Sequence, residues 1–297
     1  MLIACERFEL ASVGLTLRFA AEREVGLYYA RVDGASWNTA LLPRAQQRPG
    51  DWLFLCLISE GAVAVSDGLR LESGVPFVVT EEHIVTSSEA GPAFRSDLPS
   101  LAGVALRVRA SDLSLDVTPP SPLQASPDVT RALREALEVM QAEEVTVESL
   151  TEPWTRLLDV CVTQGLMRRR PALQQTRRES SALARARRAL FPILETLFDS
   201  PMLVDAMGRT GSTDRQLRRD ILRLQLEYGF FDRGWRGALT RWRLTAAVLL
   251  LSSDALTHAQ IAEAVGYGGL PAMDRAFKRA GLPPPSAVRA RHREPLA

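Results

Sequence analysis

The chain has few of the residues that build metal sites and disulfide frameworks. It contains three cysteines and three histidines in 297 residues. Cys5, Cys56 and Cys161 lie far apart, without the CxxC spacing of a zinc ligand pair or a redox motif. We therefore expect neither a structural zinc site nor a disulfide framework, and the sequence predicts no metal and no other cofactor.

Histidine is also too scarce for the metal chemistry of β-barrel enzymes. His83 is the only histidine before residue 258, whereas such an enzyme collects several imidazole nitrogens and a carboxylate around one ion. The sequence contains no GxSxG, no Walker loop and no dinucleotide-binding fingerprint either. We therefore expect a protein that is not an enzyme. A metal-free barrel enzyme is an alternative, but no residue points to a substrate for it.

Long apolar segments are missing as well. The richest run, AAVLLL at residues 246–251, is far shorter than the roughly 20 residues of a membrane-spanning helix. The first ten residues include charged side chains where a signal peptide would be apolar. These absences predict a cytoplasmic protein without a membrane partner.

The charge of the chain is almost balanced in total but unevenly distributed. The whole sequence has 36 basic and 35 acidic side chains. Residues 181–297 hold 18 basic and 11 acidic side chains, which leaves 18 and 24 for residues 1–180. Basic charge supplies the attraction to phosphate that dominates non-specific DNA binding. Unless it arose by chance, this asymmetry indicates that the carboxy-terminal part meets DNA.

The first 118 residues predict a small antiparallel β-domain. Short apolar or alternating runs such as WLFLCLIS and VPFVVT are typical of strands. Glycine-containing turns such as Gly50–Asp51 and Asp67–Gly68 separate these runs. Many short strands at close spacing favour a small antiparallel barrel or jelly roll over a parallel sheet.

A barrel of this kind can enclose a small effector. The predicted effector-binding residues are Trp37, Arg44, Trp52 and Phe54, chosen from a wider set of candidates that includes Tyr28, Phe77, His83 and Arg95. Strand alternation places Trp52 and Phe54 on one face and the leucines beside them on the other. The alternation does not say which face points inward, and each aromatic residue has a second interpretation as ordinary core.

Two amphipathic segments follow a proline-rich stretch and span residues 126–170. TRALREALEVM and TEPWTRLLDVCVTQGLMRR each repeat apolar residues at helical spacing. They predict a helical hairpin that packs either against the barrel or against a second subunit, and we expect a homodimer. Residues 171–184 lie in a stretch rich in arginine, glutamine and serine, and they predict a linker.

The segment THAQIAEAVGYGGLPAMDRAFKR, residues 257–279, predicts two short helices joined by a glycine turn. Thr257 can cap the first helix, and Gly266 tolerates the left-handed backbone that ends it. The second helix would bury Met273 and Phe277 while its charged residues stay outside. Such a pair either enters the DNA major groove or forms a structural corner that binds nothing.

The order of residues in this segment, IAEAVGY, a spacer, RAFKR, then Pro285 and Arg289, resembles the second DNA-binding motif of the AraC/XylS family of bacterial transcription regulators. That family carries two helix-turn-helix motifs joined by one long helix. A similar first motif lies upstream in Leu203, Ala206, Met207, Gly211, Thr213, Arg215, Leu217, Arg219 and Ile221. The joining helix corresponds to GWRGALTRWRLTAAVLLLSS, and the resemblance covers about residues 185–293.

The resemblance implies a transcription regulator of α+β architecture, with several domains in one chain. A cupin-like β-barrel at residues 1–118 and the helical connector would precede an all-α domain with two helix-turn-helix motifs at residues 185–297. The implied partners are double-stranded DNA, a small effector on the barrel, a second copy of the chain and RNA polymerase. The DNA-binding positions carried over from the family are Thr213, Arg215, Arg218, Arg219, Leu270, Pro271, Asp274, Arg275 and Lys278.

The second motif departs from the family pattern. Leu270 and Pro271 stand where polar residues are usual and offer no hydrogen bonds to bases, whereas arginines of the first motif can bond to guanine edges. Gly281 comes one residue early, and Val288 stands where an aromatic residue is common. We therefore expect the first motif to supply most base specificity. The alternative is a degenerate member that acts through protein contacts without specific DNA binding.

Overall fold

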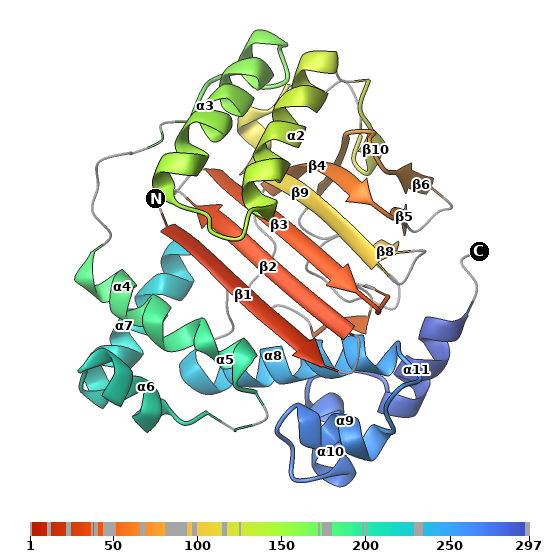
Figure 1. Ribbon diagram of the computed structural model, residues 1–297, viewed down its shortest axis with the longest axis vertical. Coiled ribbons are helices and arrows are strands. Elements are labelled where there is room, and N and C mark those ends of the chain that lie inside the picture. The colour runs from red at the N-terminus through yellow and green to blue at the C-terminus, as the bar shows by residue number, and fades with distance from the viewer. Residues whose placement is uncertain are drawn as a thin grey trace.

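The sheet lies between two groups of helices in the computed structural model (Figure 1). The structure describes residues 2–10, 13–21, 25–36, 38, 41–43, 52–65, 69–80, 94–96, 100–114, 118–124, 126–171, 173, 180–197, 199, 201–228 and 234–294, which are called the described residues below. The α2–α3 hairpin covers one side of the sheet, and the helices of the carboxy-terminal part lie on the other.

Seven strands form one antiparallel sheet. In spatial order they are β1 (Leu2–Leu10), β2 (Val13–Ala21), β3 (Val25–Asp33), β9 (Ser100–Arg109), β4 (Trp52–Glu60), β7 (Phe77–Thr80) and β10 (Ser121–Pro122). A smaller antiparallel sheet has the order β6 (Leu69–Glu72), β5 (Ala62–Val65) and β8 (Phe94–Ser96). These strands confirm the α+β class and the antiparallel β-domain.

The chain passes from the large sheet into the small one at Gly61. This glycine has a φ of +86°, and a Cβ added to it would lie 2.6 Å from the backbone oxygen of Ser100. Only glycine adopts this backbone at such a close approach without strain. Among the described residues no strand pairing joins the two sheets into a closed barrel, so barrel closure stays a prediction.

A helical hairpin covers one face of the large sheet. It consists of α2 (Pro127–Gln141) and α3 (Val147–Thr163), which follow the short 3-10 helix η2 (Ala110–Asp112) and β10. The apolar stripes of α2 and α3 share one core with residues of β3, β4 and β9. Arg18 of β2 donates from Nη1 to the carbonyl oxygen of Met140 at 2.9 Å, at the end of α2 where carbonyls lack helical partners. The predicted hairpin is thus present, and packing on the sheet already buries its stripe. The homodimer stays a prediction.

The carboxy-terminal part consists of helices. They are α4 (Ser181–Leu190), α5 (Pro192–Glu195), α6 (Leu203–Thr210), α7 (Asp214–Tyr228), α8 (Gly234–Leu251), α9 (His258–Ala264), α10 (Leu270–Arg279) and α11 (Pro285–Arg293). The second half of α8, from Leu244 to Leu251, is buried throughout. Helices α5, α7, α9, α10 and α11 all contact α8, which is therefore the centre of this part. None of the described helices is long and apolar enough to cross a membrane.

The β-domain and the carboxy-terminal helices share an interface. Phe19 of β2 packs edge-to-face against Phe191, with ring centroids 5.4 Å apart. Arg95 of β8 donates from Nη2 to the backbone oxygens of His292 at 2.8 Å and Glu294 at 2.7 Å. The two predicted domains are therefore packed against each other. Their predicted boundaries stay predictions, as does the linker at residues 171–184, part of which lies outside the described residues.

Candidate nucleic-acid interface

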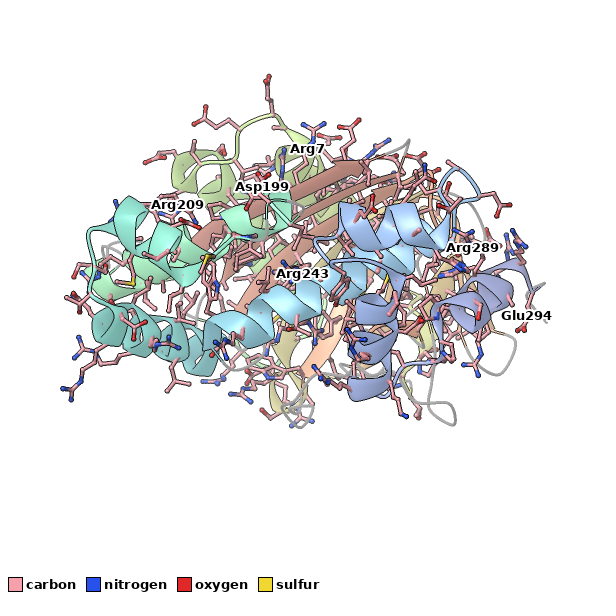
Figure 2. The ribbon with its side chains drawn as sticks, turned by 90° about the horizontal axis from the view of Figure 1, so that it is seen from below. Arg7, Asp199, Arg209, Arg243, Arg289 and Glu294 are labelled. Carbon is pink, nitrogen blue, oxygen red and sulfur yellow. The ribbon has the colours of Figure 1, made fainter. Side chains whose placement is uncertain are left out.

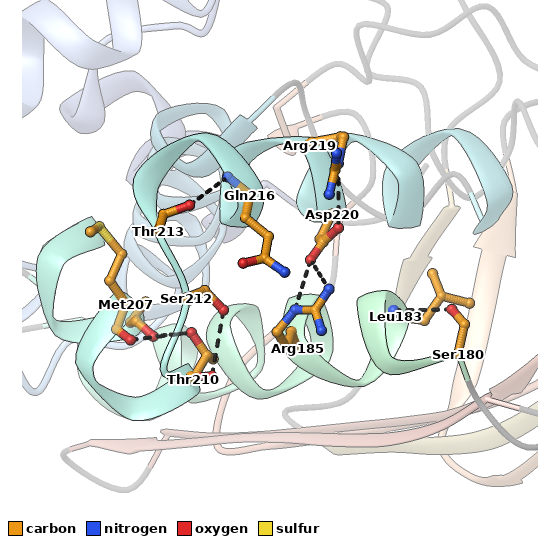
Figure 3. A network of polar contacts seen from close by, with 11 residues as sticks. Ser180, Leu183, Arg185, Met207, Thr210, Ser212, Thr213, Gln216, Arg219 and Asp220 are labelled. Carbon is orange, nitrogen blue, oxygen red and sulfur yellow. Dashed lines mark hydrogen bonds and ion pairs between the residues drawn. The ribbon is translucent and has the colours of Figure 1, made fainter.

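The first helix pair, α6 and α7, is joined by the turn that its sequence predicts. Gly211 ends α6 in the left-handed conformation, with a φ of +63°. Thr213 Oγ1 then accepts a hydrogen bond from the backbone amide of Gln216 at 3.3 Å, which caps the start of α7 (Figure 3). The structure places Thr213 in an exposed position whose hydroxyl serves the backbone of its own helix.

The inner face of α7 contains a charge that the sequence analysis missed. Leu217, Ile221 and Leu224 are fully buried, and Asp220 beside them is only 2% exposed. Asp220 Oδ2 lies 2.7 Å from Nη2 of Arg185, on α4 (Figure 3). A carboxylate at this depth is stable only with a partner. The ion pair therefore fixes the rotation of α7 against α4.

The outer face of α7 carries Arg215, Arg218 and Arg219, which are called the arginine face below. All three side chains are exposed. Arg218 Nε donates to both carboxylate oxygens of Asp214, at 2.8 and 2.9 Å, and this hydrogen bond lowers the pKa of Asp214. Arg219 is 75% exposed. The structure thus brings the three predicted arginines together on one open side of a fixed helix.

The second helix pair, α9 and α10, also matches its predicted local structure. Thr257 Oγ1 accepts from the backbone amide of Gln260, while Gln260 Oε1 accepts from the backbone amide of Thr257 at 2.9 Å. Gly266 has a φ of +78°, and the backbone amide of Tyr267 donates to the carbonyl oxygen of Ala262 at 2.8 Å. Cap and turn are therefore both formed.

The outer face of α10 is less basic than that of α7. Pro271, Asp274, Arg275 and Lys278 are exposed. Leu270, predicted as a DNA-facing residue, is partly buried and packs against the core. Only part of its side chain is therefore open to a ligand.

Two arginines of α8 contact other parts of the protein. Arg243, near the middle of α8 (Figure 2), is half-buried with its Cζ 5.6 Å from the ring centroid of Tyr267. Burial lowers the pKa of Arg243 and raises that of Tyr267 to about 12. Arg241 Nη1 donates to the carbonyl oxygen of Pro43 at 3.4 Å. Both residues therefore hold α8 in place.

Helix α11 closes the second helix pair against α8. Arg289 Nη2 donates to the carbonyl oxygen of Leu256 at 2.6 Å, in the connection between α8 and α9. Arg293 forms an ion pair with Asp254, which lowers the pKa of that carboxyl. Arg289 belongs to the sequence motif, and Figure 2 shows it on α11, where it acts as a structural residue.

The predicted effector residues of the β-domain are only partly described. Phe54 is buried in the core that continues into the carboxy-terminal helices, whereas Leu55 lies in the core beneath α2 and α3. The direction of the two strand faces is thereby known: Trp52 and Phe54 both point toward the carboxy-terminal helices, and Leu55 points toward α2 and α3. Trp37, Arg44 and the wider candidate His83 lie outside the described residues.

A basic and aromatic cluster surrounds Trp52. The Cζ atoms of Arg107 and Arg109 each lie 3.9 Å from the centroid of its ring. Arg107 Nη1 also donates to the hydroxyl oxygen of Tyr28 at 3.1 Å. Guanidinium groups over an indole ring form cation–π contacts. Arg107 and Arg109 stand at alternate positions of β9, which is the only sequence signal for this cluster, because Trp52 lies on a different strand.

Metal-binding groups are not found among the described residues. No cluster of three or more histidine, cysteine, aspartate or glutamate side chains occurs there. Cys56 and Cys161 are buried free thiols, and burial raises the pKa of Cys161 to about 12. Such thiols are protonated at neutral pH and behave as core residues.

No family model and no curated protein match the chain. The chain is similar in structure to ToxT and CuxR. The P21 crystal form of ToxT from Vibrio cholerae shares 12% identity, with 89% of this chain and 98% of that chain covered and a TM-score of 0.34. CuxR, an AraC-like transcriptional activator, shares 17% identity, with 79% and 81% covered and a TM-score of 0.34. These identities and TM-scores are too low to show the function of this chain.

Proposed function

We propose that the chain is a sequence-specific DNA-binding transcription regulator of the AraC/XylS type, and that it is not an enzyme. In this proposal α6–α7 and α9–α10 are the two helix-turn-helix motifs. Helix α7 enters one segment of the major groove, and α10 enters the next segment on the same side of the duplex.

The observation that carries the proposal is the arginine face of α7. Its three side chains are exposed, while the opposite side of the helix is held by buried leucines and by the Arg185–Asp220 ion pair. Arginine bonds to two acceptors of guanine at once, and it also clamps phosphate. A rigid helix with such a face is equipped to read base edges.

The length of α8 supports the use of both helix pairs. The helix has 18 residues and therefore measures about 27 Å. It contacts α7 as well as α9 and α10. One turn of B-DNA rises about 34 Å, so a helix of this length is suited to hold two pairs that address successive major-groove segments.

The β-domain would act as the sensor of this regulator. The stack of Arg107 and Arg109 on Trp52 places two positive charges on the face that turns toward the carboxy-terminal helices. Such a site favours a small acidic effector, whose carboxylate would accept hydrogen bonds from guanidinium groups. A second copy of the chain and RNA polymerase complete the proposed set of partners, in the cytoplasm.

A second candidate function is supported by the outer face of α10. Pro271 donates no hydrogen bond to a base, and Asp274 repels phosphate. A chain that had lost specific DNA binding would act through protein contacts instead.

DNA binding by the full-length protein separates the two candidates. We expect fluorescence anisotropy with a duplex from the region upstream of its own gene to show affinity that falls steeply as salt rises, because bound arginines release counterions. Arg215→Ala should weaken binding about tenfold, within the range of a lost bidentate contact. Arg131→Ala, which removes an exposed arginine of α2, is the matched control and should bind like the wild type. No affinity even at low salt would favour the protein-contact function.

A further inference from the structure

One leucine lies on the same side of α7 as the arginine face, about one turn after Arg218. Leu222 is 45% exposed, whereas Leu217 and Leu224 on the same helix are fully buried. At about 100° per residue, Leu222 lies within about 60° of each of the three arginines around the helix axis. Its side chain is therefore part of the surface that the proposed function assigns to DNA.

Helix α7 cannot turn Leu222 inward. The Arg185–Asp220 ion pair holds its inner face. Near the end of the helix, Gln225 is 1% exposed, and its Oε1 accepts a hydrogen bond from the backbone amide of Gly234 at 3.0 Å. A rotation that buried Leu222 would break both contacts and expose the apolar stripe. In the part of the chain that the structure describes, Leu222 therefore stays exposed and is open to a ligand.

The charges around Leu222 indicate what that ligand is. Arg218 pairs with Asp214, but Arg215 and the 75% exposed Arg219 stay open to a ligand beside Leu222. An apolar protein patch offers no anion to these guanidinium groups, whereas DNA offers phosphates and guanine edges. The major-groove edge of the bases also contains one apolar group, the C5-methyl of thymine. An apolar side chain among arginines matches a thymine among guanine and phosphate contacts.

We propose that Leu222 contacts the C5-methyl group of one thymine in the operator and thereby selects that base. The inference rests on the proposed function and adds a specificity-determining residue to it. Loss of one methyl contact is expected to weaken binding about fourfold, which corresponds to about 0.8 kcal/mol.

The test uses duplexes selected from a random pool by the full-length protein. Each thymine of a selected duplex is replaced in turn by deoxyuridine, which lacks only the methyl group. We expect one replacement to weaken wild-type binding about fourfold and to leave the affinity of Leu222→Ala unchanged, because that variant has already lost the contact. Val204→Ala, which trims a 57% exposed valine of α6, is the control and should keep the wild-type response.

The outcomes that contradict the inference are distinct from failure of the proposed function. Selection of no duplex at all would overturn both. Selected duplexes whose uridine positions weaken the wild type and Leu222→Ala equally would overturn only the role of Leu222. A change in the mass of Leu222→Ala measured by light scattering would show that the leucine joins protein subunits, and would overturn the inference as well.

Discussion

Arg95 donates a hydrogen bond from Nη2 to the backbone carbonyl oxygen of His292 at 2.8 Å. The contact joins β8 of the small sheet to the carboxyl end of α11, 197 residues further along the chain. The last carbonyls of a helix have no helical partner and carry partial negative charge, so a guanidinium group is a suitable cap for them. The position of α11 thus depends on a side chain of the β-domain.

Replacement of Arg95 by alanine should loosen α11. A part-buried hydrogen bond from a charged group contributes about 1.5 to 3 kcal/mol, so amide protons of α11 should exchange faster with solvent while those of α2 keep their rates. Arg70→Ala, at an exposed arginine of β6 on the other edge of the same small sheet, is the matched control. Equal exchange in α11 of wild type and Arg95→Ala would contradict the role of the contact.

Acidification should destabilise the protein through His292. Burial, followed by the charge of Arg95, lowers the pKa of His292 from 6.5 to about 4. Because the unfolded chain then binds more protons than the folded one between these values, the free energy of unfolding falls as pH drops through this window. The loss amounts to about 2 kcal/mol at pH 5. Urea unfolding at pH 7 and pH 5 measures it.

The matched variants for this pH dependence are His292→Gln and His258→Gln. The first removes the buried imidazole, so its stability should change less between pH 7 and pH 5 than that of the wild type. His258→Gln is the comparison variant. His258 is more exposed than His292, although burial together with the charge of Arg289 lowers its pKa as well. A wild-type pH dependence in His292→Gln would show that other groups cause the loss.

Gly266→Ala should destabilise the turn between α9 and α10. Its φ of +78° is strained for alanine, and the added Cβ would collide with the carbonyl oxygen of Leu197 and the guanidinium of Arg243. We expect thermal unfolding to show a loss of about 1 to 3 kcal/mol. Gly208→Ala is the control, because this helical glycine of α6 has open space around it and alanine should raise stability. Equal melting temperatures of the two variants would contradict the argument.

The two helix pairs should contribute unequally to base recognition. Arg219 is exposed and basic, whereas Leu270 is partly buried. With the selected operator, Arg219→Ala should lose about tenfold in discrimination against a mutated guanine, and Leu270→Ala should keep its discrimination. Competition binding with single-base operator variants measures this difference. A larger loss for Leu270→Ala would reverse the proposed division of labour.

Local features of this fold were predictable from the sequence, because caps and turns depend on neighbours in the chain. Thr257, Gly266 and Gly211 all occupy the positions that their residue types predict. Buried stripes at helical spacing likewise located α2 and α3. In these segments the propensity of each residue and the packing it meets agree, so the pattern alone was sufficient.

Contacts between distant residues were not predictable in the same way. Asp220 lies beside Ile221 in a polar helix and looks like a solvated acid until Arg185, 35 residues earlier, is placed opposite it. Alternation showed that Trp52 and Phe54 share a face, but the direction of that face depends on where α2 and α8 pack. Arg95 gives no local signal for the end of α11. Each of these relationships is set by tertiary packing rather than by spacing.

The burial of α8 has a consequence for the genome as well as for the protein. Eight consecutive residues of this helix are enclosed by the surrounding core, so its length cannot change without loss of that core. In the proposed regulator the bases of an operator can change one at a time. An insertion of five base pairs between the segments proposed for α7 and α10 would instead turn one segment to the far side of the duplex. The spacing between the two DNA segments would then be inherited more strictly than the bases within them.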